Sequence, residues 1–209
     1  MWHVRGLREL RRSPPRAALA GIDRDGAFAD RVCVPGHCAL RLPPALSLVL
    51  GAYVEPVAAA LGVLPMIERG MRVLIAGDGR IAELTARVVA AAGGEVVRGA
   101  GARVDVAIEH GGELAPLIAA LRPGGTLVLK SRLRRAVALP AGELVTRELT
   151  VRGASHGSFT AAIDWLSTRR IAVDDLLAPP RPLEEFARVF ADARASEVHK
   201  PMFAIAVRV

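Results

Sequence analysis

Residues 77–82, with the sequence GDGRIA, have the glycine spacing that proteins use to bring a backbone close to phosphate. Gly77, Gly79 and Ala82 match the pattern G-x-G-x-x-G/A, after an apolar stretch and at the start of a helical one. The glycines permit a tight turn and a close approach to a diphosphate, and the first N–H groups of the helix face the anion. We therefore predict a dinucleotide-binding site made by Gly77, Gly79, Arg80 and Ile81. The alternative is that these glycines only form a tight turn in an α/β protein and bind no nucleotide.

Arg98 decides which dinucleotide such a site would prefer. An acidic residue about 20 positions after the glycines usually holds the adenosine ribose, but this chain has Arg98 near that place. A cation there can pair with a 2′-phosphate, so we expect NAD(P), with NADP fitting better than NAD. A solvated arginine at the end of a strand is the alternative.

Strand-like and helix-like stretches alternate around this loop. Residues 72–77 are continuously apolar, as in a parallel strand covered on both faces. Ile81, Leu84, Val88 and Val89 then recur at helical spacing. Further strands are predicted at residues 95–99, 104–110, 125–131 and 148–154, with helices at 113–125 and 159–171. This order predicts an α/β fold with a doubly wound parallel sheet.

The two ends of the chain predict a smaller lobe. Residues 26–42 alternate apolar and polar side chains around Pro35 and Gly36, which is typical of half-buried strands. Residues 47–67 are helical in composition and we expect a break at Pro56. An amphipathic helix is predicted at residues 183–193, followed by a final strand.

Composition limits the environment and the partners. The chain has 209 residues, 52% of them hydrophobic, which suits one core. Pro43, Pro44, Glu55 and Pro56 interrupt the most apolar region, so we expect no membrane span, and the amino terminus lacks the apolar core of a signal peptide. We expect a cytoplasmic protein. The net charge is +7, but the arginines are scattered and aromatic residues are few, so we expect no nucleic-acid partner.

Several stretches have a specific order and spacing, among them YVEPVAAALGVL, VLIAGDGRIAEL, VDVAIEHGG, ALRPGGTLVL, ELTVRGA and RPLEEFARVFADARASEVHKPMF. In that order they resemble the medium-chain dehydrogenase/reductase family, in its zinc-type alcohol, sorbitol and threonine dehydrogenase branch. The resemblance covers about residues 22–205. It implies a Rossmann domain, a GroES-like lobe from both chain ends, and a homodimer through the strand from Leu149 to Arg152.

The departures from this family are as informative as the match. The part of the family that carries a zinc-binding cysteine and a Gly-His-Glu motif has no counterpart here. Glu55 stands where the family places a late carboxylate and is the metal candidate, but a zinc needs three protein ligands, so we expect none. Residues 98–103 replace a helix, a strand and a connection that help to build the adenine half of the cofactor site. Lys130 stands where the family has a small residue beside the nicotinamide. The resemblance therefore implies a shortened Rossmann-like sheet with a remnant of the GroES-like lobe.

Two classes of function follow. We favour a divergent, truncated relative that is zinc-independent and non-catalytic, either a dimer or an accessory subunit for a protein partner. The alternative is an NAD(P)-dependent oxidoreductase for a small alcohol or carbonyl compound, with His110 or His156 transferring protons; histidines at strand ends are also common as surface or capping residues. A nucleotide-fold methyltransferase is a third interpretation, because a glycine loop with LRPGGTLVL also occurs there.

The predicted organisation has four parts. They are a basic arm at residues 1–21, a catalytic-type lobe with a linking helix at 22–65, a shortened nucleotide-binding domain at 66–178, and a returning helix and strand at 179–209.

Overall fold

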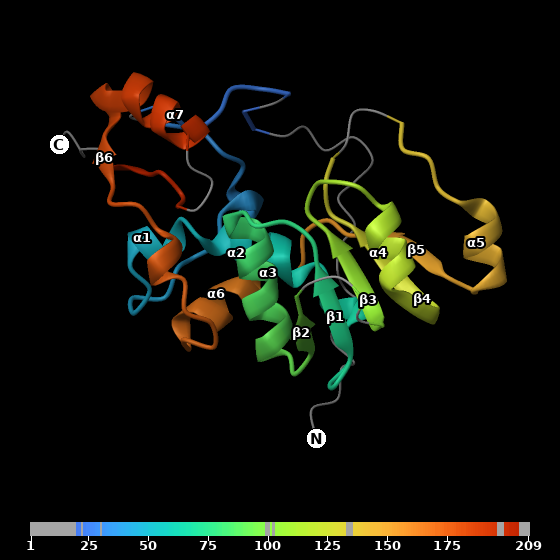
Figure 1. Ribbon diagram of the computed structural model, residues 1–209. Coiled ribbons are helices and arrows are strands. Elements are labelled where there is room, and N and C mark those ends of the chain that lie inside the picture. The colour runs from blue at the N-terminus through green and yellow to red at the C-terminus, as the bar shows by residue number, and fades with distance from the viewer. Residues whose placement is uncertain are drawn as a thin grey trace.

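A five-stranded parallel sheet forms the centre of the computed structural model, which describes residues 20–21, 23–29, 31–98, 101, 103–132, 136–195 and 199–204 (Figure 1). The strand order is β2-β1-β3-β4-β5, and every neighbouring pair is parallel. The strands are β1 (Arg72–Ile75), β2 (Glu95–Val97), β3 (Val104–Glu109), β4 (Leu121–Leu129) and β5 (Thr150–Gly153). The chain winds outward from β1 in both directions, so the predicted doubly wound α/β sheet is confirmed.

Seven helices accompany the sheet in the described part of the chain. They are α1 (Leu48–Gly51), α2 (Val54–Leu61), α3 (Arg80–Ala91), α4 (Ala115–Ala120), α5 (Ala141–Thr146), α6 (Phe159–Ser167) and α7 (Phe186–Ala195). Short 3-10 turns lie at Gly36–Cys38, Leu64–Met66, Asp174–Leu176 and Leu183–Glu185. The sequence did not predict α5, and α4 ends earlier than expected because β4 begins at Leu121.

Side chains of the sheet alternate between two apolar clusters. Val106, Ile108 and Val128 pack on one face with Val89 of α3. Ala107 and Leu127 pack on the other face with α4. Because both faces are covered, the strands read as the nearly continuous apolar runs from which they were predicted.

The connection between β2 and β3 is short, as the sequence predicted. After residues 98–103 the chain enters β3, which pairs with β1 in the register Val73↔Val106. An Asp105 carboxylate oxygen accepts a hydrogen bond of 2.6 Å from the Arg72 backbone N–H, which ties the two strands together. In the described structure β2 is therefore an edge strand.

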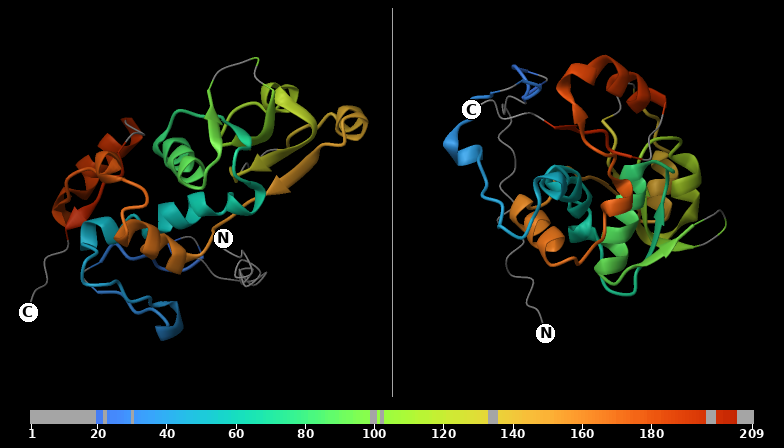
Figure 2. Two further views of the ribbon diagram at one scale, coloured as in Figure 1. Left: turned by 90° about the horizontal axis from the view of Figure 1, so that it is seen from below. Right: turned by 90° about the vertical axis from the view of Figure 1, so that its left-hand side faces the viewer.

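Segments from the two ends of the described chain, around Phe28 and Phe203, lie beside α7, which Figure 2 shows in red. The ring of Phe28 lies 5.8 Å from that of Phe190 and 5.5 Å from that of Phe203, centroid to centroid. The predicted final strand is the two-residue β7 (Phe203–Ala204), which pairs with β6 (Arg181–Pro182). The predicted basic arm lies almost wholly outside the described residues.

The strands predicted within residues 26–42 are wrong. Apart from the turn at Gly36–Cys38, residues 31–41 have no regular structure and are exposed. An alternating sequence supplies one apolar face, but a strand also needs a neighbouring strand to satisfy its backbone. No such neighbour lies along this segment in the part of the chain that the structure describes.

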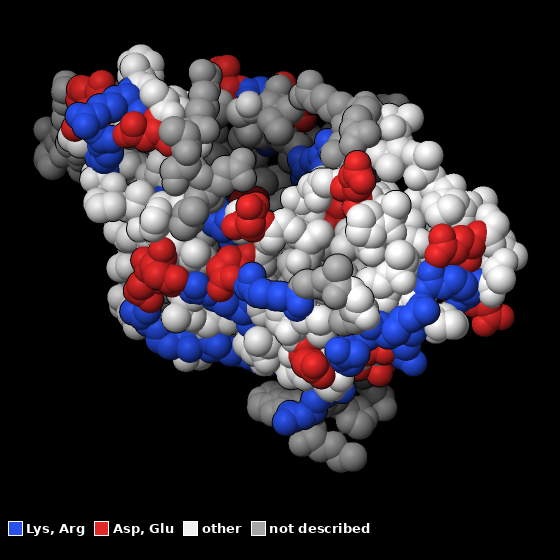
Figure 3. Space-filling model, in the orientation of Figure 1, with Lys and Arg blue, Asp and Glu red and all other residues white. Residues whose placement is uncertain are grey.

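Charged side chains of both signs are interspersed on the face shown in Figure 3. Arg87 pairs with Glu83 and Asp175, and Arg181 pairs with Glu185 and Asp192. Many of the basic residues are thus partly neutralised by neighbours, although the net charge of the chain is +7.

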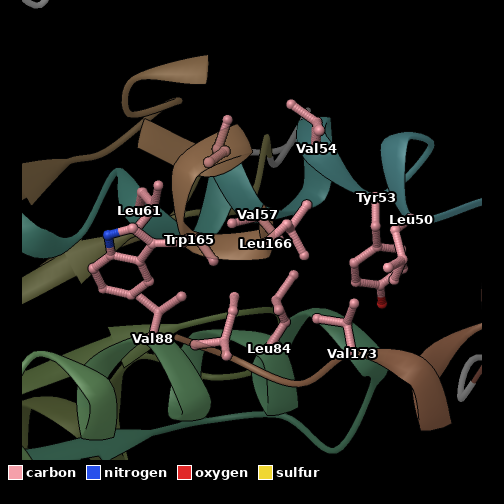
Figure 4. Packing of buried hydrophobic residues seen from close by; sticks show 14 of the residues in the cluster. Leu50, Tyr53, Val54, Val57, Leu61, Leu84, Val88, Trp165, Leu166 and Val173 are labelled. Carbon is pink, nitrogen blue, oxygen red and sulfur yellow. The ribbon is translucent and has the colours of Figure 1, made fainter. Parts of the chain in front are cut away.

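A third core cluster joins α2 and α6 to α3. Figure 4 shows Leu84 and Val88 of α3 facing Val57 of α2 and Trp165 and Leu166 of α6. Leu84, Val88 and Val57 are fully buried. This cluster fixes α2 beside the carboxyl-terminal ends of the strands, where the candidate site lies.

Residues 47–67 bear on two expectations. The stretch Leu48–Met66 is long and apolar enough, by length and composition, to cross a membrane, although half of it is buried in the core, and the expectation of no membrane span stays a prediction. The expected position of the helical break is corrected. The helical break falls at residues 52–53, between α1 and α2. Pro56 lies in the first turn of α2, where backbone N–H groups have no partner within the helix, so its missing N–H costs little.

Candidate functional site

The predicted site residues gather at the carboxyl-terminal ends of the strands. Gly77 follows β1, His110 follows β3, Lys130 follows β4 and His156 follows β5. In open parallel sheets, ligands bind outside these ends, at the point where the winding reverses. Here the reversal lies between β1 and β3, and Gly77 and His110 stand at it.

The first cavity, which we call the glycine-loop cavity, has a volume of about 450 Å³ and is lined by Gly77, Gly79, Arg80, Ile81 and Lys130 among others. Gly77 has φ +101°, a left-handed conformation that favours glycine, and a Cβ there would lie 3.3 Å from the Cβ of His110. Gly79 is the N-cap of α3, and the buried Nε of Arg80 has no hydrogen-bond partner among the described residues. The structure thus brings together four of the five residues predicted to bind a cofactor.

Arg98, the fifth of these residues, does not line the glycine-loop cavity. Its guanidinium donates to the Glu83 carboxylate at 2.7 Å, and its side chain is 68% exposed. Arg98 and Arg87 both hold the pKa of Glu83 below its usual value through these hydrogen bonds. A 2′-phosphate at Arg98 would have to compete with this carboxylate.

The second cavity, which we call the lysine cavity, has a volume of about 600 Å³ and lies between α2 and the ends of β4 and β5. Glu55, Lys130 and His156 are in its wall. It shares Ile81, His110, Lys130 and Ser131 with the glycine-loop cavity. Lys130 therefore stands at the boundary between the two spaces.

Lys130 extends from the end of β4 across the site. Its Nζ donates to the backbone carbonyls of Ala59 in α2 and of Ser155 after β5, each at 2.7 Å. Burial, with the nearby charge of Arg132, lowers the pKa of Lys130 to about 8. The side chain therefore connects the end of β4 with α2 and with the segment after β5.

Glu55 and His156, 101 residues apart in the sequence, are brought into contact in this wall. Nε2 of His156 lies 2.8 Å from Oε1 of Glu55, and Nδ1 lies 3.3 Å from the Ser155 hydroxyl. Phe159 stacks on the imidazole with 5.9 Å between ring centroids. An imidazole and a carboxylate thus lie side by side in the wall of the lysine cavity.

His110 is the other predicted proton donor. Burial, together with the charge of Lys130, lowers its pKa to about 4, so it is neutral at physiological pH. Its buried Nε2 has no hydrogen-bond partner in the described structure. A neutral imidazole can accept or donate a hydrogen bond to a ligand in either cavity, but it is a poor general acid near pH 7.

Glu109 is a buried carboxylate that the sequence analysis missed. It is fully buried at the end of β3 and accepts hydrogen bonds from the backbone N–H groups of Gly111, Lys130 and Ser131. Burial opposes its ionisation, but the hydrogen bonds from Ser131, Gly111 and Lys130 together outweigh burial and hold its pKa below the usual value. The signal was available, since a charged residue follows four buried positions of β3.

The described residues do not fit a zinc ion. No three His, Cys, Asp or Glu side chains gather in this part of the chain. Glu55 is engaged by His156, and Cys33 and Cys38 are exposed free thiols. The expectation that no zinc binds stays a prediction.

Comparisons with known proteins bear on this geometry. No family model matches the chain. D-xylulose reductase A of Aspergillus niger is 24% identical over 86% of this chain and 63% of the relative. An alcohol dehydrogenase of Escherichia coli CFT073, solved with NADH, superposes with a TM-score of 0.79 at 17% identity, over 87% of this chain and 66% of that one. A protein described as a zinc-binding dehydrogenase of Sinorhizobium meliloti 1021, bound to NADP, gives a TM-score of 0.72 at 26% identity, over 88% and 65%.

The parallel sheet with its glycine loop defines a Rossmann-like α/β fold, which this chain shares with dehydrogenases solved with NADH and with NADP. The curated relatives include xylulose reductases, and the structural neighbours include a zinc-binding dehydrogenase, a galactitol-1-phosphate dehydrogenase and an NAD-dependent alcohol dehydrogenase, so the resemblance to the medium-chain dehydrogenase/reductase family is confirmed.

The chain spans 63% of the length of the curated relatives that it matches. The alignment has 227 positions but takes in only 86% of the 209 residues, so these relatives carry residues inside the aligned region that this chain lacks. This agrees with the short connection between β2 and β3.

Proposed function

We propose that this protein binds a nucleotide through its diphosphate at the glycine loop and transfers no hydride, as a non-catalytic relative of the dehydrogenases. The observation that carries the proposal is the position of Lys130, whose Nζ is hydrogen-bonded to the carbonyls of Ala59 and Ser155 between the two cavities.

The two ends of a nicotinamide dinucleotide fit this site differently. The diphosphate end fits, because Gly77 has the required backbone conformation and the Nε of Arg80 lacks a partner in the described structure. The nicotinamide end would meet the side chain of Lys130, which extends from the end of β4 to the carbonyl of Ala59 in α2. When bound, the dinucleotide would supply a hydride donor or acceptor; Gly77, Gly79 and Arg80 would hold its diphosphate.

Calorimetry with ADP-ribose, NADH and NADPH tests the proposal. We expect ADP-ribose and NADH to bind with affinities within about threefold of each other, because the nicotinamide adds no contact. The variant Lys130→Ala should bind NADH more tightly than ADP-ribose, whereas Lys200→Ala, which changes a lysine outside both cavities, should not. Binding of NADH to the unaltered protein about tenfold tighter than ADP-ribose would refute the proposal. A comparison of the affinities for NADPH and NADH tests whether Arg98 favours the 2′-phosphate.

The second candidate is an NAD(P)-dependent oxidoreductase for a small alcohol or carbonyl compound. The contact between His156 and Glu55 favours it, because the pair could exchange a proton with a substrate in the lysine cavity. Consumption of NADH or NADPH with a panel of small aldehydes and ketones would select this function. We do not propose the methyltransferase, since the relatives reported above are dehydrogenases.

We further propose that the protein is cytoplasmic and forms a homodimer through β5. In the described sheet β5 is an edge strand, and Thr150, Arg152 and Gly153 are exposed. Parallel or antiparallel addition of a second copy would satisfy backbone groups on that edge. Sedimentation equilibrium should give twice the mass of the chain, and a monomer at all concentrations tested would contradict the dimer. A protein partner other than a second copy remains the alternative.

A further inference from the structure

Lys130 has surroundings that suit a reactive amine as well as a structural one. It is one of only two lysines in the sequence, the other being Lys200. Lys130 lines both the glycine-loop and the lysine cavities, which have volumes of about 450 and 600 Å³, and the two residues that hold its Nζ, Ala59 and Ser155, line the lysine cavity. A small molecule in the lysine cavity would therefore lie beside this nitrogen.

The number of carbonyl acceptors at Lys130 equals the number of N–H groups on a neutral amine. An ammonium has three N–H donors, and only two acceptors, on Ala59 and Ser155, are within reach in the described structure. A neutral amine has two N–H bonds, so the same two carbonyls satisfy both of them. Its lone pair is then left available to a ligand.

Burial is the largest cause of the lowered pKa of Lys130, and the charged groups around the side chain act in both directions. Arg132 after β4 places a second positive charge near the nitrogen and lowers its pKa, while Glu55 of α2 acts in the opposite direction with a smaller effect. His110 after β3 is neutral, and His156 after β5 is bound to Glu55. Desolvation is the largest cause of the lowered pKa, and desolvated lysines are the ones that form imines in proteins.

We propose that Lys130 is a covalent binding site for a small aldehyde, which it captures as an imine inside the lysine cavity. The amine nitrogen attacks the carbonyl carbon, a C–N bond forms, and a proton moves from nitrogen to oxygen to give a carbinolamine. The hydroxyl group then takes up a proton and leaves as water, and the C=N bond forms without any change in oxidation state. The protonated imine keeps one N–H, which can still donate to one of the two carbonyls. This site goes beyond nucleotide binding and does not depend on it.

Reductive trapping tests the proposal on the whole chain. The protein is incubated at pH 7 with pyridoxal and cyanoborohydride, and the label on each lysine is measured by peptide mass spectrometry. We expect at least about tenfold more label on Lys130 than on Lys200, because only Lys130 lines the cavities. Lys200 is a matched reference, since it too is partly buried and its Nζ donates to a backbone carbonyl, that of Ala52 at 2.9 Å.

Variants separate a reactive lysine from a purely structural one. Lys200→Arg should keep the label and Lys130→Arg should lose it, with circular dichroism confirming that each variant is folded. Arg132→Gln should move the pH at which labelling of Lys130 is half-maximal upward, because it removes a neighbouring positive charge. If Lys130→Arg does not fold, the ratio of label on Lys130 to label on Lys200 in the unaltered protein tests the proposal. Equal labelling of both lysines, or no label on Lys130, would show that the Lys130 side chain only connects α2 with the segment after β5.

Discussion

Gly62→Ala is expected to lower the free energy of unfolding by about 3 kcal/mol, because the new Cβ would overlap backbone rather than a movable side chain. A Cβ at Gly62 would meet the carbonyl oxygen of Ser155 and lie 3.0 Å from its carbonyl carbon. Gly157 lies in the same segment after β5 and donates its N–H to the carbonyl of Ala58 in α2 at 2.6 Å. The end of α2 and the segment after β5 are therefore too close to admit a methyl group.

Urea denaturation measures this effect, and Gly142→Ala supplies the control. Gly142 lies in the exposed helix α5, and a Cβ there would have no atom within 4 Å. Alanine is a better helix former than glycine, so this variant should be unchanged or up to about 1 kcal/mol more stable. Equal stability of the two variants would mean that the contact between α2 and the segment after β5 does not form in solution.

Glu109→Gln is expected to destabilise the protein by a similar amount, about 3 kcal/mol. The carboxylate accepts from the backbone N–H groups of Lys130 at 3.2 Å and of Ser131 at 3.0 Å, as well as from that of Gly111. Glutamine is close in shape, but its NH₂ group would face one of these donors and leave it unsatisfied in a fully buried place. Glu113 lies four residues further along the sequence and is exposed. Glu113→Gln should therefore change the free energy of unfolding by less than about 0.5 kcal/mol.

The pH dependence of this difference gives an independent check. Folding lowers the pKa of Glu109 from its ordinary value of 4.5, so its contribution to stability is fully present above that value. The contribution is lost as the pH falls through the lowered pKa of the folded protein. The gap between the unaltered protein and Glu109→Gln should therefore be constant above about pH 5 and narrow in more acidic solution. A gap that does not vary with pH would mean that folding does not lower the pKa of Glu109.

The central sheet could be predicted because its strands carry their own signal. Residues 73–77 are apolar throughout and residues 104–108 are apolar except for Asp105, and a parallel sheet buried on both faces needs such runs. The alternating residues 26–42 gave a wrong prediction, since alternation describes one face of a strand and says nothing of whether a neighbouring strand is present. The predicted boundaries of the four parts of the chain stay a prediction.

The candidate site was predictable only where a local motif describes it. The glycine loop is local, so Gly77, Gly79, Arg80 and Ile81 could be read from one short stretch. The contact between Glu55 and His156 joins residues from α2 and from the segment after β5, and nothing local in either sequence indicates the other. Glu109 and Lys130 are single residues whose roles come from three-dimensional neighbours.

The short connection between β2 and β3 has a consequence for how the chain folds. Arg72 and Asp105, which join β1 to β3, are only 33 residues apart. A shorter loop loses less entropy when its ends are brought together, and a lower mean sequence separation of contacts goes with faster folding. The centre of this sheet should therefore assemble more quickly than in relatives that insert further residues there, which reduces the time for which its apolar strands are exposed to aggregation.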